Sequence, residues 1–153
     1  MIVKHIVDED FVNYKTTSML ILFHTCSFKC GRVICQNNLL TTYPDIDISI
    51  EDIVWRYTSN QLSRALVLSG LEPFDSYDDL IALAQYFRRK SSAPIVIYSG
   101  YTEDEITNDF KEIYTINNVI IKFGRYIPGH KSHFDNVLGV SLSSDNQYAK
   151  QIS

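Results

Sequence analysis

The stretch MLILFHTCSFKCGRVICQN, from Met19 to Asn37, decides how the rest of the sequence is interpreted. Its first five residues, Met19 to Phe23, form an uninterrupted apolar run of the length that is typical of a buried strand. The remainder is a loop that holds all three cysteines of the chain, Cys26, Cys30 and Cys35. The stretch therefore predicts a strand whose carboxyl end carries an unusual, cysteine-rich loop.

Short β-rich runs alternate with amphipathic stretches along the rest of the chain. Further strands are predicted at Arg64 to Gly70, Ile95 to Gly100 and Asn118 to Gly124. Helices are predicted between them. The first runs from Ile50 to about Tyr57, where Ser49 and Asp52 resemble a capping box. The second is capped by Asp75 or Ser76 and has Leu80, Ala84 and Phe87 on one face, and the third is capped by Thr102 and contains Ile106, Phe110 and Ile113. This alternation predicts right-handed crossovers and a mostly parallel sheet, in which ligands bind beyond the carboxyl ends of the strands.

The length of 153 residues predicts a single domain over residues 1–153. Hydrophobic residues make up 45% of the chain and charged residues 21%, which is typical of a globular protein and disfavours a disordered chain. The formal net charge of −4 supplies no basic surface for a phosphate backbone, so we expect no nucleic-acid ligand.

Neither a membrane helix nor a signal peptide is expected. The best apolar candidate, Ser18 to Phe23, is far shorter than the roughly 18 residues that a membrane span needs. The N-terminus carries Asp8, Glu9 and Asp10 where a signal peptide requires an apolar run. We therefore expect a cytoplasmic protein, in which cysteines serve more often as metal ligands, catalytic groups or buried fillers than as disulfides.

The placement of the cysteines is more informative than their number. Three randomly scattered cysteines would all fall within ten residues in roughly one chain in a hundred, so a shared role is favoured. Three independent buried thiols and a structural zinc site with His24 as fourth ligand are the weaker alternatives. A [4Fe-4S] cluster held by Cys26, Cys30 and Cys35 fits better, and it leaves one iron without a protein ligand, free to bind a substrate.

Two segments of this sequence resemble the radical S-adenosylmethionine (SAM) superfamily. Its usual cluster loop has the pattern C-x3-C-x2-C with an apolar residue before the last cysteine. Cys26 and Cys30 keep the first interval, Ile34 is the apolar residue before Cys35, and the second interval has four residues instead of two. VLSGLEPFDS, Val67 to Ser76, is similar to the superfamily's Gly-Gly-Glu-Pro segment: Gly70, Glu72 and Pro73 match, and Leu71 replaces the second glycine.

Three more segments resemble the small activating proteins of anaerobic ribonucleotide reductases within this superfamily. They are Cys35-Gln36-Asn37, IYSGYTEDEI from Ile97 to Ile106, and SLSSDNQYAKQI from Ser141 to Ile152. The resemblance runs from about Asn13 to the end of the chain. It implies an abbreviated radical SAM core, and because a complete barrel takes about 250 residues, we expect a partial, splayed (β/α) barrel.

The resemblance also implies an activity. A reduced [4Fe-4S] cluster with bound SAM would cleave a C–S bond and release methionine and a 5'-deoxyadenosyl radical. That radical would take a hydrogen from the Cα of a glycine in a large partner, a glycyl radical enzyme similar to anaerobic ribonucleoside-triphosphate reductase. Flavodoxin or ferredoxin would be the electron donor. The cofactors supply the chemistry, and the protein supplies ligation, orientation and exclusion of water.

The same resemblance suggests how further residues contact SAM. Ile34 would lie against the adenine, with the backbone of Gln36 near its edge. Gly70 and Glu72 would hold the methionine end. Asn37 could hydrogen-bond within the loop, and Ser99 could reach the ribose or carboxylate or be a plain turn serine.

Two other functions remain open at this point. One is a radical SAM enzyme that acts on a small molecule, such as a deazaguanine synthase. The other is a non-catalytic [4Fe-4S] electron-transfer or structural protein, which the irregular cysteine interval and Leu71 would allow.

Overall fold

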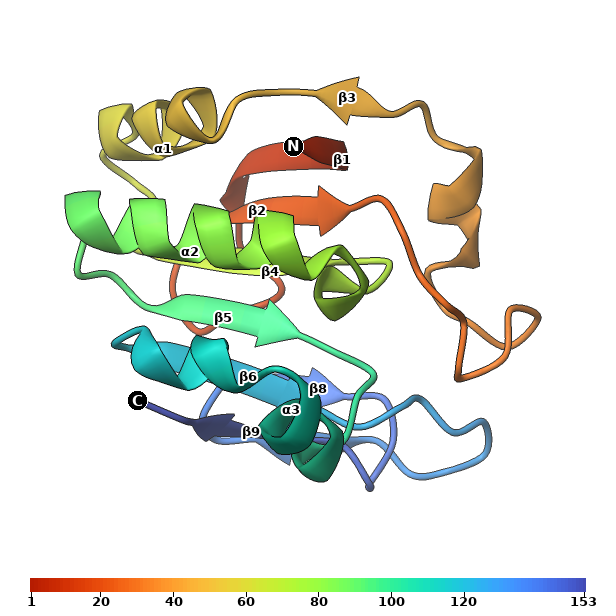
Figure 1. The fold of residues 1–153 in the computed structure, drawn as a ribbon. Coiled ribbons are helices and arrows are strands. Elements are labelled where there is room, and N and C mark those ends of the chain that lie inside the picture. The colour runs from red at the N-terminus through yellow and green to blue at the C-terminus, as the bar shows by residue number, and fades with distance from the viewer.

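The computed structural model describes residues 1–153 and shows an open, mixed sheet of seven strands with three helices (Figure 1). The strand order is β3-β1-β2-β4-β5-β6-β9. The bounds are β1 Ile2–Asp10, β2 Ser18–Phe23, β3 Ile46–Asp47, β4 Ala65–Gly70, β5 Ile95–Tyr98, β6 Val119–Phe123 and β9 Tyr148–Gln151. The sheet does not close into a barrel, since β3 and β9 form its two edges.

The centre of the sheet matches the sequence prediction. Strands β2, β4, β5 and β6 run parallel, with Leu20 opposite Val67 and Val67 opposite Val96. Almost every residue of these strands is buried, as expected for parallel strands that are covered on both faces. Their carboxyl ends therefore lie at the same edge of the sheet, which is where the cysteine loop begins (Figure 1).

The margins of the sheet are antiparallel and make the sheet mixed around the parallel centre that the sequence predicts. Of the six pairings in this sheet, the three outside the centre are antiparallel: β1 with β2, β1 with β3, and β6 with β9. The mixed pattern of polar and apolar residues in Ile2–Asp10 and the polar Tyr148–Gln151 gave no strong strand signal. Their strand conformation comes from pairing with the buried centre, an effect of tertiary context.

Three α-helices connect the central strands: α1 Ile50–Ser59, α2 Tyr77–Lys90 and α3 Glu103–Asp109. The Ser49 hydroxyl caps α1 by accepting from the Asp52 amide at 3.0 Å. Thr102 and Glu105 form a reciprocal capping box at α3. Helix α2 begins after a 3-10 turn, η2 Pro73–Ser76, and the Ser76 side chain makes no cap hydrogen bond.

The third helix is shorter than the sequence predicts. Helix α3 ends at Asp109, and a separate 3-10 turn, η3 Lys111–Thr115, carries Ile113. Phe110 breaks the helix with φ −131° and ψ 47°. Thr, Asn and Asp, which all have low helix propensity, occupy the last turn at residues 107–109. The helix therefore ends at Asp109, although the helical spacing of apolar residues continues to Ile113.

The two faces of the sheet have different covers. Helices α1 and α2 lie over one face (Figure 1), where alternate strand residues such as Met19, Leu68 and Ile121 join the larger core. On the other face, Leu20, Val67 and Val96 pack with Tyr14 and with Leu138 and Leu142 from the C-terminal third. That part of the chain contains a separate antiparallel pair of short strands, the hairpin of β7 His133–Asp135 and β8 Val140–Leu142. No helix of the protein has the length and apolarity needed to cross a membrane.

Candidate iron-sulfur and SAM site

The cysteine loop leaves the sheet at the end of β2 and returns through a 3-10 turn, η1 Asn38–Thr42. All three thiols are free and half-buried. They border one cavity of about 310 Å³ at the carboxyl ends of the central strands. The cavity is also lined by Val12 from the loop between β1 and β2, by Ser141 from β8, and by Gln36, Asn37, Gly70, Leu71, Glu72, Ser99, Lys122 and Gln147.

The turn after β4 forms the floor of this cavity. Gly70 has a positive φ of 95°, and a Cβ there would lie 2.6 Å from the Phe23 amide nitrogen. Only glycine lets β4 approach β2 so closely while it turns away. The Asn37 side chain donates to the Gly70 carbonyl at 2.6 Å, which ties the far end of the cysteine loop to this turn.

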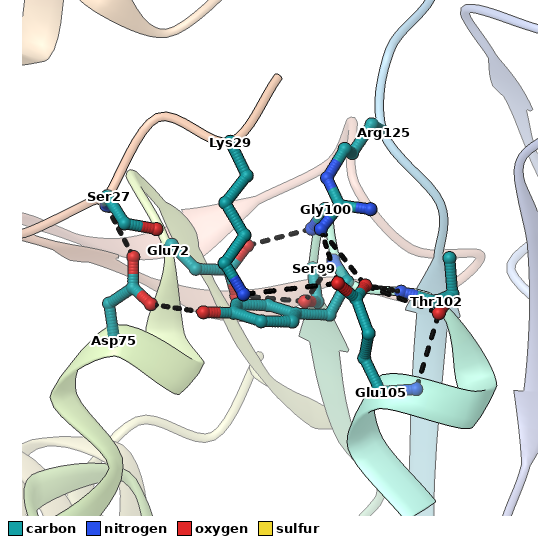
Figure 2. A network of polar contacts seen from close by, with 10 residues as sticks. Ser27, Lys29, Glu72, Asp75, Ser99, Gly100, Thr102, Glu105 and Arg125 are labelled. Carbon is teal, nitrogen blue, oxygen red and sulfur yellow. Dashed lines mark hydrogen bonds and ion pairs between the residues drawn. The ribbon is translucent and has the colours of Figure 1, made fainter. Parts of the chain in front are cut away.

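Glu72 is the most deeply buried carboxylate of the site, 5% exposed. It accepts hydrogen bonds from the Ser99 hydroxyl at 2.8 Å and the Gly100 amide at 2.8 Å (Figure 2). A third comes from the Phe74 amide at 3.2 Å. Burial nevertheless raises its pKa to about 7. A cationic group entering the cavity would stabilise the ionised form, so Glu72 is suited to receive an ammonium.

Lys122 is a functional candidate that the sequence analysis missed. Its side chain is 7% exposed at the end of β6, and its ammonium donates to the carbonyl oxygens of Ser99 at 3.1 Å and Gly124 at 2.8 Å. Burial lowers its pKa to about 8. The available signal was a lysine inside the apolar run of β6, since buried lysines are rare unless paired. The cavity thus combines a buried carboxylate and a buried ammonium.

The predicted contact residues occupy different places. Ser99 is 2% exposed. Its hydroxyl donates to the Glu72 carboxylate and accepts from the Tyr101 amide at 3.0 Å. Gln36 and Asn37 border the main cavity. Ile34 does not border it: this side chain lines a neighbouring cavity of about 470 Å³ with Tyr126 and Tyr148.

The extra residues of the second cysteine interval point away from the protein. Val33 is 95% exposed, and Arg32 is exposed as well. The backbone contacts of this part are local, from the Gly31 amide to the Phe28 carbonyl at 2.8 Å and from the Cys35 amide to the Arg32 carbonyl at 3.4 Å. The longer interval is therefore accommodated as an outward turn.

The arrangement of the three thiols can be compared with what a single metal ion and a [4Fe-4S] cluster each require. No three His, Cys, Asp or Glu side chains of the protein converge on a point where a single metal ion could bind. A cubane cluster makes a different demand, because each thiolate binds a separate iron at the periphery of the cube. Three half-buried thiols around one cavity, without a fourth cysteine, fit a [4Fe-4S] cluster that would be held by three thiolates and would keep one iron without a protein ligand.

A comparison with protein families agrees with this donor set. The family model described as "4Fe-4S single cluster domain" matches residues 12–148, nearly the whole chain. The chain belongs to this 4Fe-4S family. No curated protein and no solved structure matches it.

Membership of the 4Fe-4S family supports the iron-sulfur cofactor and is compatible with the radical SAM resemblance. The matched range begins just before the Asn13 end of that resemblance and includes both the cysteine loop and the turn at Glu72. It is equally compatible with an iron-sulfur protein of another activity, so the finer assignment depends on the cavity beside the cysteines.

Proposed function

We propose that this protein is a radical SAM activating enzyme, which cleaves SAM reductively and generates a glycyl radical on a large partner enzyme. The observation that carries the proposal is a single cavity bordered both by the three cysteines and by Gly70, Glu72 and Lys122. When bound, a reduced [4Fe-4S] cluster supplies the electron that splits the sulfonium of SAM into methionine and the 5'-deoxyadenosyl radical.

The chain's own residues have the charges needed to orient SAM. The α-ammonium of its methionine end would bind Glu72, which is held in place by three hydrogen bonds. Lys122 has used two of its three N–H groups on carbonyl oxygens, which leaves one for the ligand carboxylate. Burial of both groups excludes water and strengthens each contact. A zwitterionic amino-acid end is therefore the ligand chemistry that this floor favours.

The open sheet suits a macromolecular substrate. Strands β3 and β9 leave the sheet unclosed, and the cysteine loop presents exposed Val33 at its tip. A loop of a partner protein can approach such a site more readily than the interior of a closed barrel. We propose anaerobic ribonucleoside-triphosphate reductase as the partner and flavodoxin or ferredoxin as the electron donor.

The proposal is tested by anaerobic reconstitution with iron and sulfide, reduction with dithionite and addition of SAM. We expect 5'-deoxyadenosine from the wild type and none from Cys35→Ala. A glycyl radical signal on an added reductase subunit would separate the activating enzyme from one that acts on a small molecule. A stable [4Fe-4S] cluster that leaves SAM intact would contradict the proposal and favour an electron-transfer protein.

A further inference from the structure

Both peptide groups that flank Cys26 are hydrogen-bonded to the turn after β4. On one side, the carbonyl oxygen of Thr25 accepts from the Glu72 amide at 2.8 Å. On the other side, the amide of Ser27 donates to the Asp75 carboxylate at 2.5 Å (Figure 2). These two contacts fix the planes of both peptide bonds and therefore the direction of the Cα–Cβ bond of Cys26 between them.

The other two cysteines have no comparable support. The hydrogen bonds of the backbone around Cys30 and Cys35 are made within the loop itself, such as the one from the Asn38 amide to the Cys35 carbonyl at 3.2 Å. The next long-range hydrogen bond of the loop is the one from the Asn37 side chain to the Gly70 carbonyl. The loop thus has one cysteine that is aligned by the sheet and two that are aligned by local turns.

Asp75 sits on a rigid support. It belongs to η2, next to Phe74, which is 2% exposed, and its own amide donates to the Glu72 carbonyl at 3.1 Å. Its second carboxylate oxygen accepts from the Tyr101 hydroxyl at 2.6 Å. The Tyr101 side chain is buried, 6% exposed. One oxygen of the Asp75 carboxylate therefore binds a buried hydroxyl, while the other binds the amide of the cysteine loop.

A second contact ties the next part of the loop to Tyr101. The Lys29 ammonium lies 4.2 Å from the centroid of the Tyr101 ring and 3.9 Å from Glu105. Glu105 is in turn bound by Arg125 at 2.7 Å (Figure 2). Tyr101 therefore contacts the loop through its ring and through Asp75, although its own side chain contacts no cysteine in this network.

We infer that Asp75, oriented by Tyr101, is a positioning residue that holds Cys26 ready to bind iron before the rest of the loop closes around a cluster. This inference rests on the proposed function only for the identity of the bound group. The positioning itself is a property of the chain without iron.

The test measures the alkylation rate of each cysteine in the iron-free full-length protein under anaerobic conditions, by mass spectrometry. In Asp75→Ala, we expect Cys26 to react about fivefold faster, the factor for about 1 kcal/mol of one lost hydrogen bond. Cys35 should react at the wild-type rate. Asp75→Asn keeps an oxygen for the Ser27 amide and a donor for the Tyr101 oxygen, so it should restore a rate close to that of wild type.

Asp78→Ala is the matched control, because it removes an exposed carboxylate three residues along the chain that makes no contact with the loop. It should leave all three rates unchanged. An unchanged Cys26 rate in Asp75→Ala, an equal rise at all three cysteines, or an Asn variant that behaves like the Ala variant would overturn the inference. If Asp75→Ala does not fold, Tyr101→Phe replaces it, with an expected rise of about twofold at Cys26 alone.

The result is independent of SAM chemistry. A wild-type protein that binds a cluster but does not cleave SAM would contradict the proposed function and leave these rates as expected. Normal SAM cleavage with no selective effect at Cys26 would contradict the positioning role of Asp75 alone.

Discussion

The floor of the cavity and the cysteine loop above it are built in opposite ways. The floor consists of strand ends and turns with buried, mutually hydrogen-bonded groups, such as Glu72 and Ser99. The loop from His24 to Asn37 contains no fully buried residue, and most of its backbone hydrogen bonds are local. The difference indicates that tertiary packing fixes the polar pocket, whereas the loop depends mainly on its own turns. Changes in the loop should affect cluster chemistry, and changes in the floor should affect stability.

Loss of a cysteine is the largest expected effect and should leave the fold intact. Cys35 is half-buried in the loop, and its removal takes nothing from the hydrophobic core. Cys35→Ala should abolish cluster-dependent SAM cleavage and change the free energy of unfolding of the iron-free protein by less than about 0.5 kcal/mol. Product analysis and urea unfolding measure the two effects. A large loss of stability would show that the loop is part of the folded framework.

Two glycines with the same backbone conformation separate the regions directly. Gly70 in the floor and Gly31 in the loop have φ values of 95° and 92°. A Cβ at Gly70 meets backbone atoms of Leu22 and Phe23 at 2.6–2.9 Å, whereas at Gly31 it meets only the Ile34 side chain at 3.4 Å. Gly70→Ala should destabilise the protein by about 3 kcal/mol or more, and Gly31→Ala by about 1 kcal/mol.

Denaturant unfolding of both variants without iron provides the comparison. Equal losses of unfolding free energy in the two variants would mean that the loop backbone is packed as tightly as the floor, which would contradict the difference between the two regions.

The buried carboxylate predicts a dependence on pH. Because burial raises the pKa of Glu72 to about 7, the folded state holds this proton more tightly than the unfolded chain. Stability from this group is present at low pH and is lost as the pH rises toward 7. Relative to Glu72→Gln, the wild type should lose up to about 3 kcal/mol between pH 4.5 and pH 8, as measured by urea unfolding.

Glu105 provides a control of opposite sign. The Arg125 guanidinium lowers the pKa of Glu105 to about 2, so its carboxylate stabilises the folded protein at neutral pH and this contribution is lost in acid. Glu105→Gln should therefore be most destabilising at neutral pH. The same sign of pH dependence for both variants would contradict the assignment of Glu72 as the carboxylate that burial keeps protonated.

The smallest effect is expected for shortening the outward turn of the loop. Arg32 and Val33 are exposed, and their deletion restores the usual two-residue interval between the second and third cysteines. Because short changes in loop length alter closure entropy little, the iron-free protein should keep its stability within about 0.5 kcal/mol. Iron and sulfide analysis after reconstitution should show an unchanged cluster content. Loss of the cluster would mean that the longer interval is required.

Much of the fold could be predicted because local signals and tertiary structure agree in its centre. The apolar runs at Met19–Phe23 and Asn118–Gly124 and the cap at Thr102 all specify the elements that form. The antiparallel margins could not be predicted in this way, since β1 and β9 acquire their conformation from their neighbours in the sheet.

The two loops that the sequence singled out lie around one cavity in the structure, the cysteine loop on one side and Gly70 to Glu72 on the other. Their supporting contacts were not predicted. The roles of Lys122 and Asp75 depend on which side chains meet across three strand ends. No periodicity or motif within one segment predicts these contacts between segments, so they could be identified only in the structure.

The central claim is that three thiolates hold a [4Fe-4S] cluster whose fourth iron is open to SAM. Its most direct test is the electron paramagnetic resonance spectrum of the reconstituted, reduced protein, recorded before and after addition of SAM labelled with nitrogen-15 at the amino group. The account predicts a changed spectrum with hyperfine coupling to the labelled nitrogen. An unchanged spectrum of a fully loaded [4Fe-4S] cluster would contradict it.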